Sequence, residues 1–281
     1  MTLSGLRCAV LVSVSVFTGC FPWRAPERVR EFNRLDVARE APGEVRALNL
    51  GKSGLAGWPE GLDRFPVLER LSLRGVALGA VPPSVSGLKT VTWMDLGSCS
   101  IAALPPEIGR LGALKTLYLS GNSLTNLPSG LGQCAALEYL NLDDNPLVAL
   151  PAEMGQLTSL RWLRLNRAKL TSLPPEVGRL KNLRRLYLRD NQLTNLPESM
   201  GDLAALTDLS LCRNKLSEFP PCLMRLAALR RLELQANGLK RLPGDLSSLS
   251  GLQSLRLDGN ELSQDEKQRV RSALPNCYIV F

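Results

Sequence analysis

Histidine is absent from all 281 residues of the chain. Its absence excludes Ser-His-Asp triads, HExxH zinc sites and acid–base catalysis by imidazole. Aromatic residues make up only 5% of the chain, whereas hydrophobic residues make up 44%, so aliphatic side chains, leucine above all, must fill the core. Charged residues make up 21%, with a formal net charge of +8. This is the composition of a globular protein, and its basic excess favours acidic partners.

Long hydrophobic runs are also missing. After one positive charge at Arg7, residues 8–17 form an apolar run, whereas a helix that spans a membrane needs about 20 apolar residues. A run of this length is typical of the hydrophobic region of a secretory signal. We therefore expect residues 1–19 to be a signal peptide. A buried strand or a short membrane helix is the alternative.

The end of this run resembles the lipobox of bacterial lipoproteins. Val16-Phe17-Thr18-Gly19-Cys20 places a small residue before a cysteine, although Phe17 stands where the lipobox usually has leucine. The resemblance implies lipidation of Cys20 and anchoring to a membrane of the bacterial cell envelope, with residues 20–28 as a tether; each buried CH₂ contributes about 0.8 kcal/mol to such anchoring. A cytoplasmic protein with an uncleaved N-terminus is the alternative.

A period of 23 residues runs through the rest of the chain. Ten consecutive frames cover residues 45–274 without insertion or deletion, on the pattern L-x-x-L-x-L-x-x-N-x-L-x-x-L-P-x-x-[ILVM]-G-x-L-x-x. Self-similarity at a fixed period of this length is the signature of a repeat architecture. The pattern is identified as leucine-rich repeat, and the proline at position 15 of the frame resembles the Ras-group type.

The resemblance implies an α/β solenoid. This is a curved horseshoe with a parallel β-sheet on its concave face, short helical or 3-10 segments on its convex face and helical caps at both ends. Within a frame, leucines at positions 4 and 6 alternate with outward residues at positions 3 and 5, as a strand with one buried face requires. No frame buries its own apolar face, so the frames must stack into one continuous core.

Two other positions recur in most frames. In this family the asparagine at position 9 turns inward and bonds the backbone of neighbouring turns. This structural ladder comprises Asn122, Asn145, Asn191, Asn214, Asn237 and Asn260. The first three frames have Ser53, Val76 and Cys99 at this position. Position 19, where we expect a positive φ, is occupied by Gly109, Gly132, Gly155, Gly178 and Gly201.

The ends of the array need caps. Residues 29–44 are predicted to form an N-terminal cap, with a helix over 29–41 that stops at Pro42-Gly43. The tenth frame loses its Leu-Pro pair, and Ser263-Gln264-Asp265-Glu266 is a capping-box sequence that begins a helix. We expect this helix to end near Leu274 and a last strand to follow, so that residues 263–281 form the C-terminal cap.

Cysteine spacing and motifs argue against an enzyme. Beyond Cys8 and Cys20 the chain has Cys99, Cys134, Cys212, Cys222 and Cys277. None has C-x₂-C spacing, so we expect no metal site and mostly buried, unpaired thiols, which favour the cytoplasmic alternative. Gly51-Lys52-Ser53 looks like the end of a phosphate-binding loop, but Arg46 stands where that loop needs glycine. We expect no cofactor and no catalysis.

The concave face carries the residues that we expect to bind a partner. Positions 3 and 5 hold Trp and Tyr residues in frames three to seven, on strands about 4.8 Å apart. Tyr139 and Trp162 should stack, with Arg185 in cation–π reach of Trp162. The predicted partner-binding residues are Trp93, Tyr118, Tyr139, Trp162, Arg164, Arg185, Tyr187, Arg189, Asp208 and Arg231. The alternative is that the rings only pack on one another.

Exposed rings beside arginines are typical of protein-binding surfaces. Charges of both signs alternate on this face, whereas nucleic-acid binding needs a stripe of one sign. We therefore expect a non-enzymatic protein that binds an acidic protein partner, and the Ras-group resemblance implies a scaffold role, sometimes in signalling. The second hypothesis is a glycan ligand stacked on the rings, in an envelope-binding or wall-organising role.

Overall fold

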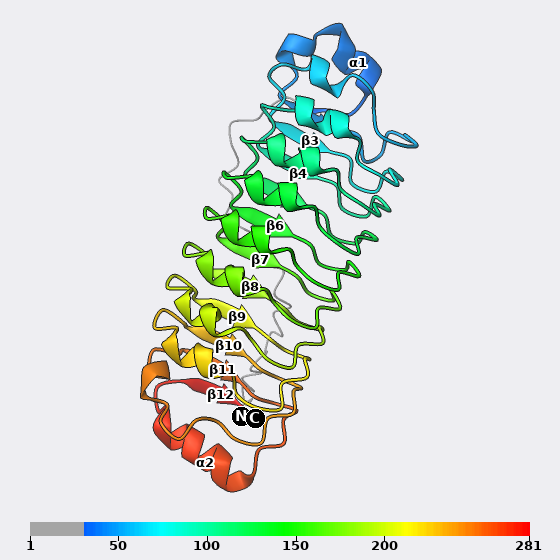
Figure 1. Ribbon diagram of the computed structural model, residues 1–281. Coiled ribbons are helices and arrows are strands. Elements are labelled where there is room, and N and C mark those ends of the chain that lie inside the picture. Colours follow the sequence, from blue (N-terminus) through cyan, green and yellow to red (C-terminus); the bar gives the residue numbers. More distant parts are fainter. Residues whose placement is uncertain (1–30) are drawn as a thin grey trace, which may run out of the picture.

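The computed structural model describes residues 31–281. Within this range, twelve parallel strands form one open sheet, and each strand pairs with the strands that precede and follow it in the sequence (Figure 1). The strands are β1 (Glu31–Phe32), β2 (Ala47–Asn49), β3 (Arg70–Ser72), β4 (Trp93–Asp95), β5 (Thr116–Tyr118), β6 (Tyr139–Asn141), β7 (Trp162–Arg164), β8 (Arg185–Tyr187), β9 (Asp208–Ser210), β10 (Arg231–Glu233), β11 (Ser254–Arg256) and β12 (Tyr278–Val280). The signal peptide, Cys20 and the tether predicted from the sequence lie outside the described residues.

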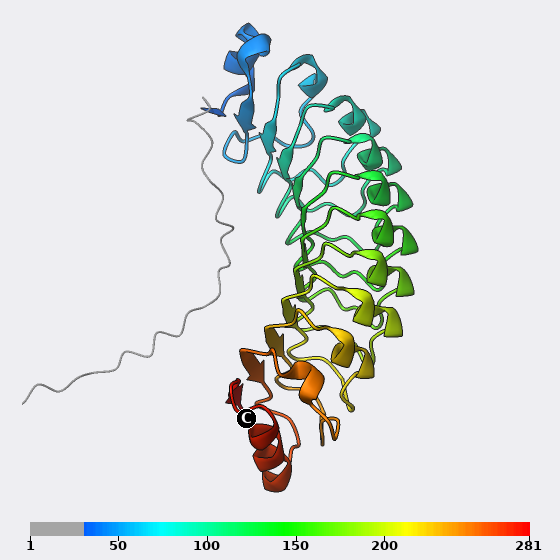
Figure 2. The same ribbon diagram turned by 90° about the vertical axis from the view of Figure 1, so that its left-hand side faces the viewer.

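The sheet lines the concave side of a curved solenoid, and short 3-10 segments line its convex side (Figure 2). The segments are η1 (Pro42–Glu44), η2 (Leu62–Arg64), η3 (Pro83–Gly87), η4 (Pro106–Arg110), η5 (Ser129–Gln133), η6 (Ala152–Gln156), η7 (Pro175–Arg179), η8 (Glu198–Asp202), η9 (Pro221–Arg225) and η10 (Ser247–Leu249). From η3 to η9 each segment follows a proline in extended conformation, which has no N–H to continue strand pairing. The predicted α/β solenoid is confirmed.

The core is a single column of aliphatic side chains that runs through the whole solenoid. Leu117 of β5 pairs in register with Met94 of β4 and Leu140 of β6, and all three are fully buried. Burial of one leucine side chain stabilises the fold by about 2 kcal/mol. Because each frame covers the apolar surface of the next, the repeat period itself sets the strand order.

The N-terminal cap differs from the predicted helix over 29–41. Helix α1 (Leu35–Glu40) is shorter, and it is preceded by β1, which pairs with Ala47 and Leu48 of β2. Phe32 is 7% exposed and belongs to the core. The predicted helix is therefore wrong at its start. Residues 31–32 form a strand instead, because the backbone N–H and C=O groups at the edge of β2 need hydrogen-bond partners.

The C-terminal end has the elements that the capping-box sequence predicts. Helix α2 (Gln264–Ala273) begins after Ser263, whose hydroxyl accepts a hydrogen bond from the backbone N–H of Glu266 at 3.2 Å. Strand β12 then pairs with β11 and covers the last frame. Within residues 31–281, neither helix is long and apolar enough to cross a membrane.

The position-19 glycines do not adopt the positive φ that the sequence predicts, and that prediction is wrong. Left-handed backbone occurs instead at position 8, in Ser98, Asp144, Arg167, Asp190, Arg213 and Ala236, and at position 10 in Ser100 and Lys169. Position 19 needs glycine for a different reason, close approach of neighbouring turns. A Cβ on Gly178 would lie 2.3 Å from the carbonyl oxygen of Ser199 in the next 3-10 segment.

Candidate functional site

A row of four aromatic rings crosses the concave face from β4 to β7. The Trp93 and Tyr118 ring centroids are 5.7 Å apart, those of Tyr118 and Tyr139 are 4.9 Å apart, and those of Tyr139 and Trp162 are 5.7 Å apart. The last pair is in contact as predicted, but its planes are inclined by 50° rather than stacked face to face. Tilted geometry is favourable because it sets a ring edge toward a ring face.

The row is more buried than the sequence predicts. Tyr139 and Trp162 are only 6% and 7% exposed, whereas Trp93, Tyr118 and Tyr187 are half-buried. Burial is also the main cause that raises the pKa of the Tyr139 and Tyr187 hydroxyls. The expectation of exposed rings is therefore wrong for Tyr139 and Trp162, which contribute to packing along the sheet.

Arginines lie on the rings at both ends of the row. The guanidinium carbon of Arg70 is 4.7 Å from the Trp93 ring centroid, and that of Arg185 is 4.2 Å from the Trp162 ring centroid. The predicted cation–π contact of Arg185 is thus confirmed. Arg164 makes a third such contact, 5.6 Å from the Tyr187 ring centroid.

Buried carboxylates hold Arg185 and Arg164 in place. Asp208 on β9 is 6% exposed; its carboxylate is ion-paired with Arg231 and lies 3.8 Å from Nε of Arg185. The Thr207 hydroxyl donates a hydrogen bond of 2.6 Å to the same carboxylate. Asp208, Arg185 and Arg231 were all predicted site residues, and the structure brings them together on β8, β9 and β10.

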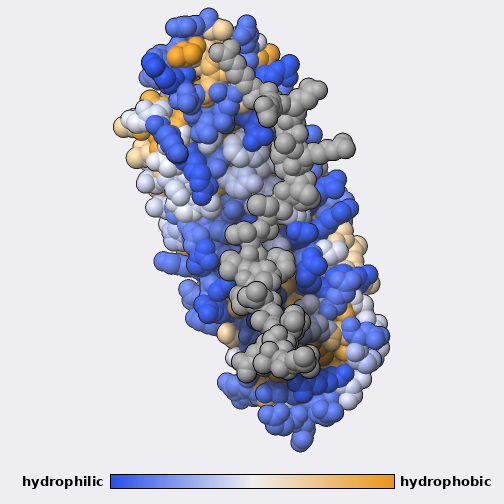
Figure 3. All heavy atoms as spheres, turned by 180° about the vertical axis from the view of Figure 1, so that it is seen from behind, coloured by the Kyte–Doolittle hydropathy of each residue, from blue (hydrophilic) through white to orange (hydrophobic). Residues whose placement is uncertain are grey.

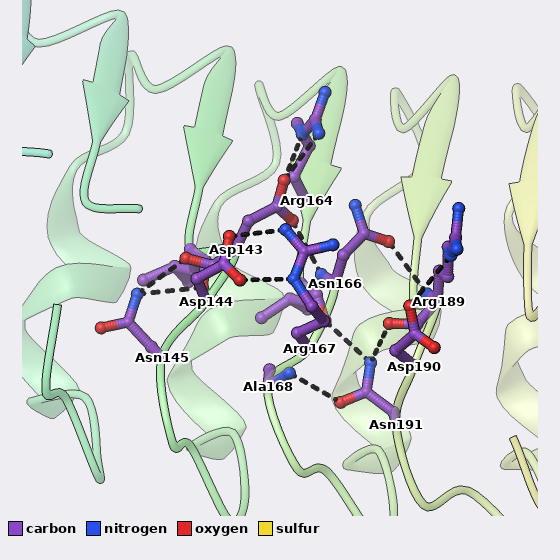
Figure 4. Close-up of polar contacts among 12 residues, drawn as sticks. Asp143, Asp144, Asn145, Arg164, Asn166, Arg167, Ala168, Arg189, Asp190 and Asn191 are labelled. Carbon is purple, nitrogen blue, oxygen red and sulfur yellow. Dashed lines mark hydrogen bonds and ion pairs between the residues drawn. The ribbon is translucent and has the colours of Figure 1, made fainter. Parts of the chain in front are cut away.

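A second buried carboxylate, that of Asp143, lies just after the end of β6 (Figure 4). Asp143 is 4% exposed. It accepts a hydrogen bond of 2.7 Å from Nε of Arg164 and another of 2.7 Å from the backbone N–H of Asn166. Arg164 therefore has one face on the Tyr187 ring and its nitrogen atoms on Asp143, which fixes its orientation.

Arg189 belongs to a third group, at the end of the strands rather than on them. Its Nε donates a hydrogen bond of 2.9 Å to Asp190 (Figure 4). The other oxygen of Asp190 lies 3.7 Å from Nη1 of Arg213. Next to it, Arg167 forms a bidentate pair with Asp144, and hydrogen bonding from Arg167 is the main cause that lowers the pKa of the Asp144 carboxyl.

The six predicted ladder asparagines all point into the solenoid. Nδ2 of Asn122 donates to the carbonyl oxygens of Leu96 and Leu119, at 2.9 and 2.8 Å. Its Oδ1 accepts from the N–H groups of Cys99 and Ile101, at 3.0 and 2.9 Å. The other members donate to carbonyl oxygens in the same way. The sixth frame has Ala168 at this position and interrupts the ladder.

A second ladder, absent from the sequence analysis, follows position 7. The Asp143 side chain accepts from the backbone N–H of Asn166 at 2.7 Å, and the Asn166 side chain accepts from that of Arg189 at 2.9 Å. Asn141, at position 5, accepts from the N–H of Asp143 at 3.0 Å within the same frame. The sequence signal was the Asp or Asn residue at position 7, two residues before position 9 of the first ladder. This second ladder joins the strand ends of β6, β7 and β8 and stiffens the rim of the candidate site.

Among the described residues, the groups that could carry metal or thiol chemistry are few. Within residues 31–281, no group of three or more Cys, Asp or Glu residues is arranged to hold a metal ion. Cys99, Cys134, Cys212 and Cys222 are buried and unpaired, as predicted, and Cys277 is partly buried. Burial raises the pKa of Cys134 and Cys222 to about 11, so neither is a thiolate near neutral pH.

The described surface on the side of the sheet is mainly polar (Figure 3). The site is an open strip across several strands, held by rings, guanidinium groups and buried carboxylates. Such a strip suits an extended ligand better than a small molecule, which binds in an enclosed cleft.

Solved structures that are similar to this chain are repeat proteins of bacteria and plants. A leucine-rich repeat protein of Leptospira interrogans, LIC12759, is 26% identical over 90% of this chain and 100% of that chain, with a TM-score of 0.49. The ectodomain of the Arabidopsis thaliana receptor kinase GASSHO1/SCHENGEN3, in complex with CASPARIAN STRIP INTEGRITY FACTOR 2, is 33% identical over 77% of this chain and 27% of that chain, with a TM-score of 0.65.

The plant peptide hormone receptor RGFR1, in complex with RGF2, is 24% identical over 83% of this chain and 42% of that chain, with a TM-score of 0.60. The chain thus spans less than half of either plant receptor structure. No curated protein matches the sequence. Family models match residues 129–278, as a leucine-rich repeat region, and residues 89–147, as leucine rich repeat. The first match covers more than half of the chain, and the protein therefore belongs to the leucine-rich repeat family.

Proposed function

We propose that this protein binds a partner protein of acidic character on the concave face between β4 and β10, without catalysing a reaction. One observation carries the proposal. Arg164 and Arg185 each lie against an aromatic ring and each face a buried carboxylate, at 5.6 and 4.2 Å from the ring centroids. Side chains fixed in this way lose little conformational entropy when a ligand binds, which is a property of binding hot spots.

The relatives support a protein ligand. The receptor ectodomain that is 33% identical is in complex with CASPARIAN STRIP INTEGRITY FACTOR 2. The more distant RGFR1 shares the fold. Leucine-rich repeats are a common architecture for extended concave binding surfaces, and a scaffold role in signalling is the finer form of the same proposal.

A peptide display selection tests the proposal. Random 12-residue peptides are selected on the folded protein, and the dissociation constants of the enriched peptides are measured for Arg185→Ala and Arg231→Ala. Each variant should lose about 2 kcal/mol of binding free energy or more. Arg179→Ala on the convex segment η7 is the matched control and should bind as the unchanged protein does. Equal affinity for all variants would place the ligand elsewhere and overturn the proposal.

A glycan ligand is the competing function, and the row of rings from Trp93 to Trp162 is the observation that favours it. Sugar rings would depend on Trp93 and only weakly on Arg189 or Arg231. A glycan array probed in parallel separates the two functions, because a glycan that binds with Trp93→Ala sensitivity and no arginine sensitivity contradicts the proposed protein partner.

The location of the protein is part of the proposal. The apolar run over residues 8–17 and the lipobox-like sequence that ends at Cys20 support a lipid-anchored protein of the bacterial envelope. Intact mass after expression in a bacterial host tests this, with Cys20→Ala as control. A species that begins at Cys20 and carries acyl chains is expected. An unmodified chain that begins at Met1 would favour the cytoplasmic alternative.

A further inference from the structure

Two carboxylates on the concave side are each shared by two arginines. Asp208 faces both Arg185 and Arg231, and Asp190 faces both Arg189 and Arg213. One carboxylate neutralises one guanidinium group, so each set of three residues has a formal charge of +1. The four arginine side chains are between 32% and 61% exposed, so this excess charge faces solvent.

The other charged residues nearby cancel only part of this excess. Glu233 on β10 accepts a hydrogen bond of 2.7 Å from the Ser210 hydroxyl and adds one negative charge, so the four arginines and three carboxylates together have a formal charge of +1. Arg256 and Asp258 pair with each other at 3.5 Å. The strip from β8 to β10 therefore offers two separate positive sites, at Asp208 and at Asp190.

The two positive sites lie at opposite ends of the strands. Arg185 is at position 3 of its frame and Arg189 is four residues further on, roughly 13 Å away at the rise of a β-strand. A ligand that runs along the solenoid axis crosses between them. In an extended chain, successive side chains point to opposite sides. Two acidic residues at odd spacing, such as i and i+1, would reach both sites.

The rings and the positive sites occupy different parts of the strip. The row from Trp93 to Trp162 covers β4 to β7, and the shared carboxylates serve β8 to β10. From β5 to β9 the sheet extends about 19 Å at 4.8 Å per strand. That distance corresponds to about six residues of extended chain.

We propose, on the basis of the proposed function, that the ligand is an extended protein segment with a fixed charge pattern. A bulky apolar residue contacts the rings over β4 to β6, and an acidic pair at odd spacing contacts Arg185, Arg231, Arg189 and Arg213 about six residues away. The charge complementarity of the two sites sets both the composition and the register of the segment.

An array of synthetic 12-residue peptides tests this pattern. Each peptide carries one tryptophan and two aspartates in a Gly/Ser background. The aspartates are adjacent or two residues apart, they lie three, six or nine residues from the tryptophan, and both chain directions are included. We expect the peptides with adjacent aspartates six residues from the tryptophan to bind the full-length protein at least ten-fold more tightly than the other spacings. Replacement of both aspartates by asparagine should abolish this advantage.

Arg185→Gln combined with Arg189→Gln should remove the preference, whereas Arg110→Gln combined with Arg179→Gln on the convex face, with the same loss of charge, should keep it. Unchanged melting temperatures establish that both double variants are folded. Peptide binding that depends on tryptophan but is equal for aspartate and asparagine overturns this inference and the acidic character of the partner, and it leaves a protein ligand on the concave face standing. Absence of binding by every peptide overturns the inference, and the display selection then decides the proposed function separately.

Discussion

Arg185 covers the ring of Trp162, with its guanidinium carbon 4.2 Å from the ring centroid. The two residues are in-register partners on β7 and β8. The contact joins the aromatic part of the concave face to its arginine-rich part. Because Trp162 is 7% exposed, the pair contributes to the stability of the sheet as well as to its surface.

Truncation of this ring should destabilise the protein. Trp162→Ala removes the contacts with Tyr139 and Arg185 and is expected to lower the free energy of unfolding by about 3 kcal/mol, while Trp162→Phe should cost less than half as much. Urea unfolding followed by circular dichroism measures both. Tyr278→Ala, at a ring that is 71% exposed, is the control and should change the free energy by less than about 0.5 kcal/mol.

The asparagine ladder predicts how loss and gain of one asparagine change the free energy of unfolding. Asn145 is 1% exposed and accepts from the N–H of Leu124 at 3.1 Å, so Asn145→Ala leaves a buried donor unpaired and should cost about 2 kcal/mol. At the interrupted frame, the N–H of Leu147 already donates to the carbonyl oxygen of Asn145 at 2.8 Å. Ala168→Asn should therefore add no more than about 1 kcal/mol. A loss on Ala168→Asn equal to that of Asn145→Ala would contradict this description of the ladder.

The packing of neighbouring turns predicts that glycine is required at position 19. Gly178→Ala should lower the free energy of unfolding by about 2 kcal/mol or more, because its Cβ would meet the Ser199 carbonyl oxygen at 2.3 Å. Gly112→Ala is the matched control, since nothing lies within 4 Å of its Cβ. It should be neutral or slightly stabilising. Similar effects of the two substitutions would show that close approach does not explain the glycine.

Buried thiols predict a loss of stability in alkali. Burial raises the pKa of Cys134 and Cys222 to about 11, above the ordinary value of about 8.5. Between these two values the folded state binds more protons than the unfolded state. Stability from these thiols is therefore complete below about pH 8.5 and falls as the pH rises toward 11.

The measurement is the free energy of unfolding at pH 7.5 and pH 10. Cys134→Ala should show a smaller decrease between the two pH values than the unchanged protein, because one of the titrating thiols is gone. The remaining titratable groups are common to both proteins and cancel in the comparison. A decrease of the same size in both proteins would mean that Cys134 is not the source of the pH dependence.

Much of the fold was predictable because the 23-residue repeat places equivalent residues of successive frames next to one another. Leu117 and Leu140 stand at the same position of successive frames, and that spacing alone implies parallel strands in register. The Asn122 ladder, the contact between Arg185 and Trp162 and the capping box at Ser263 also depend on residues at fixed spacing.

Features that depend on the path of the backbone were not predictable. A glycine at position 19 is compatible with either a positive φ or a close approach, and only the distance from Gly178 to Ser199 decides between them. The hydrogen bond between Asp143 and Asn166 was missed because position 7 varies in residue type from frame to frame. The burial of Tyr139 likewise depends on how its neighbours tilt, which a sequence period does not specify.

Photo-cross-linking of a bound peptide tests the central claim most directly. A display-selected peptide that carries a benzophenone group at its centre is irradiated with the protein, and the joined residues are identified by mass spectrometry. We expect cross-links on the strand residues between Trp93 and Glu233, and their loss in Arg185→Ala but not in Arg179→Ala. Cross-links confined to the convex segments between Pro106 and Arg225 would contradict a binding site on the concave face.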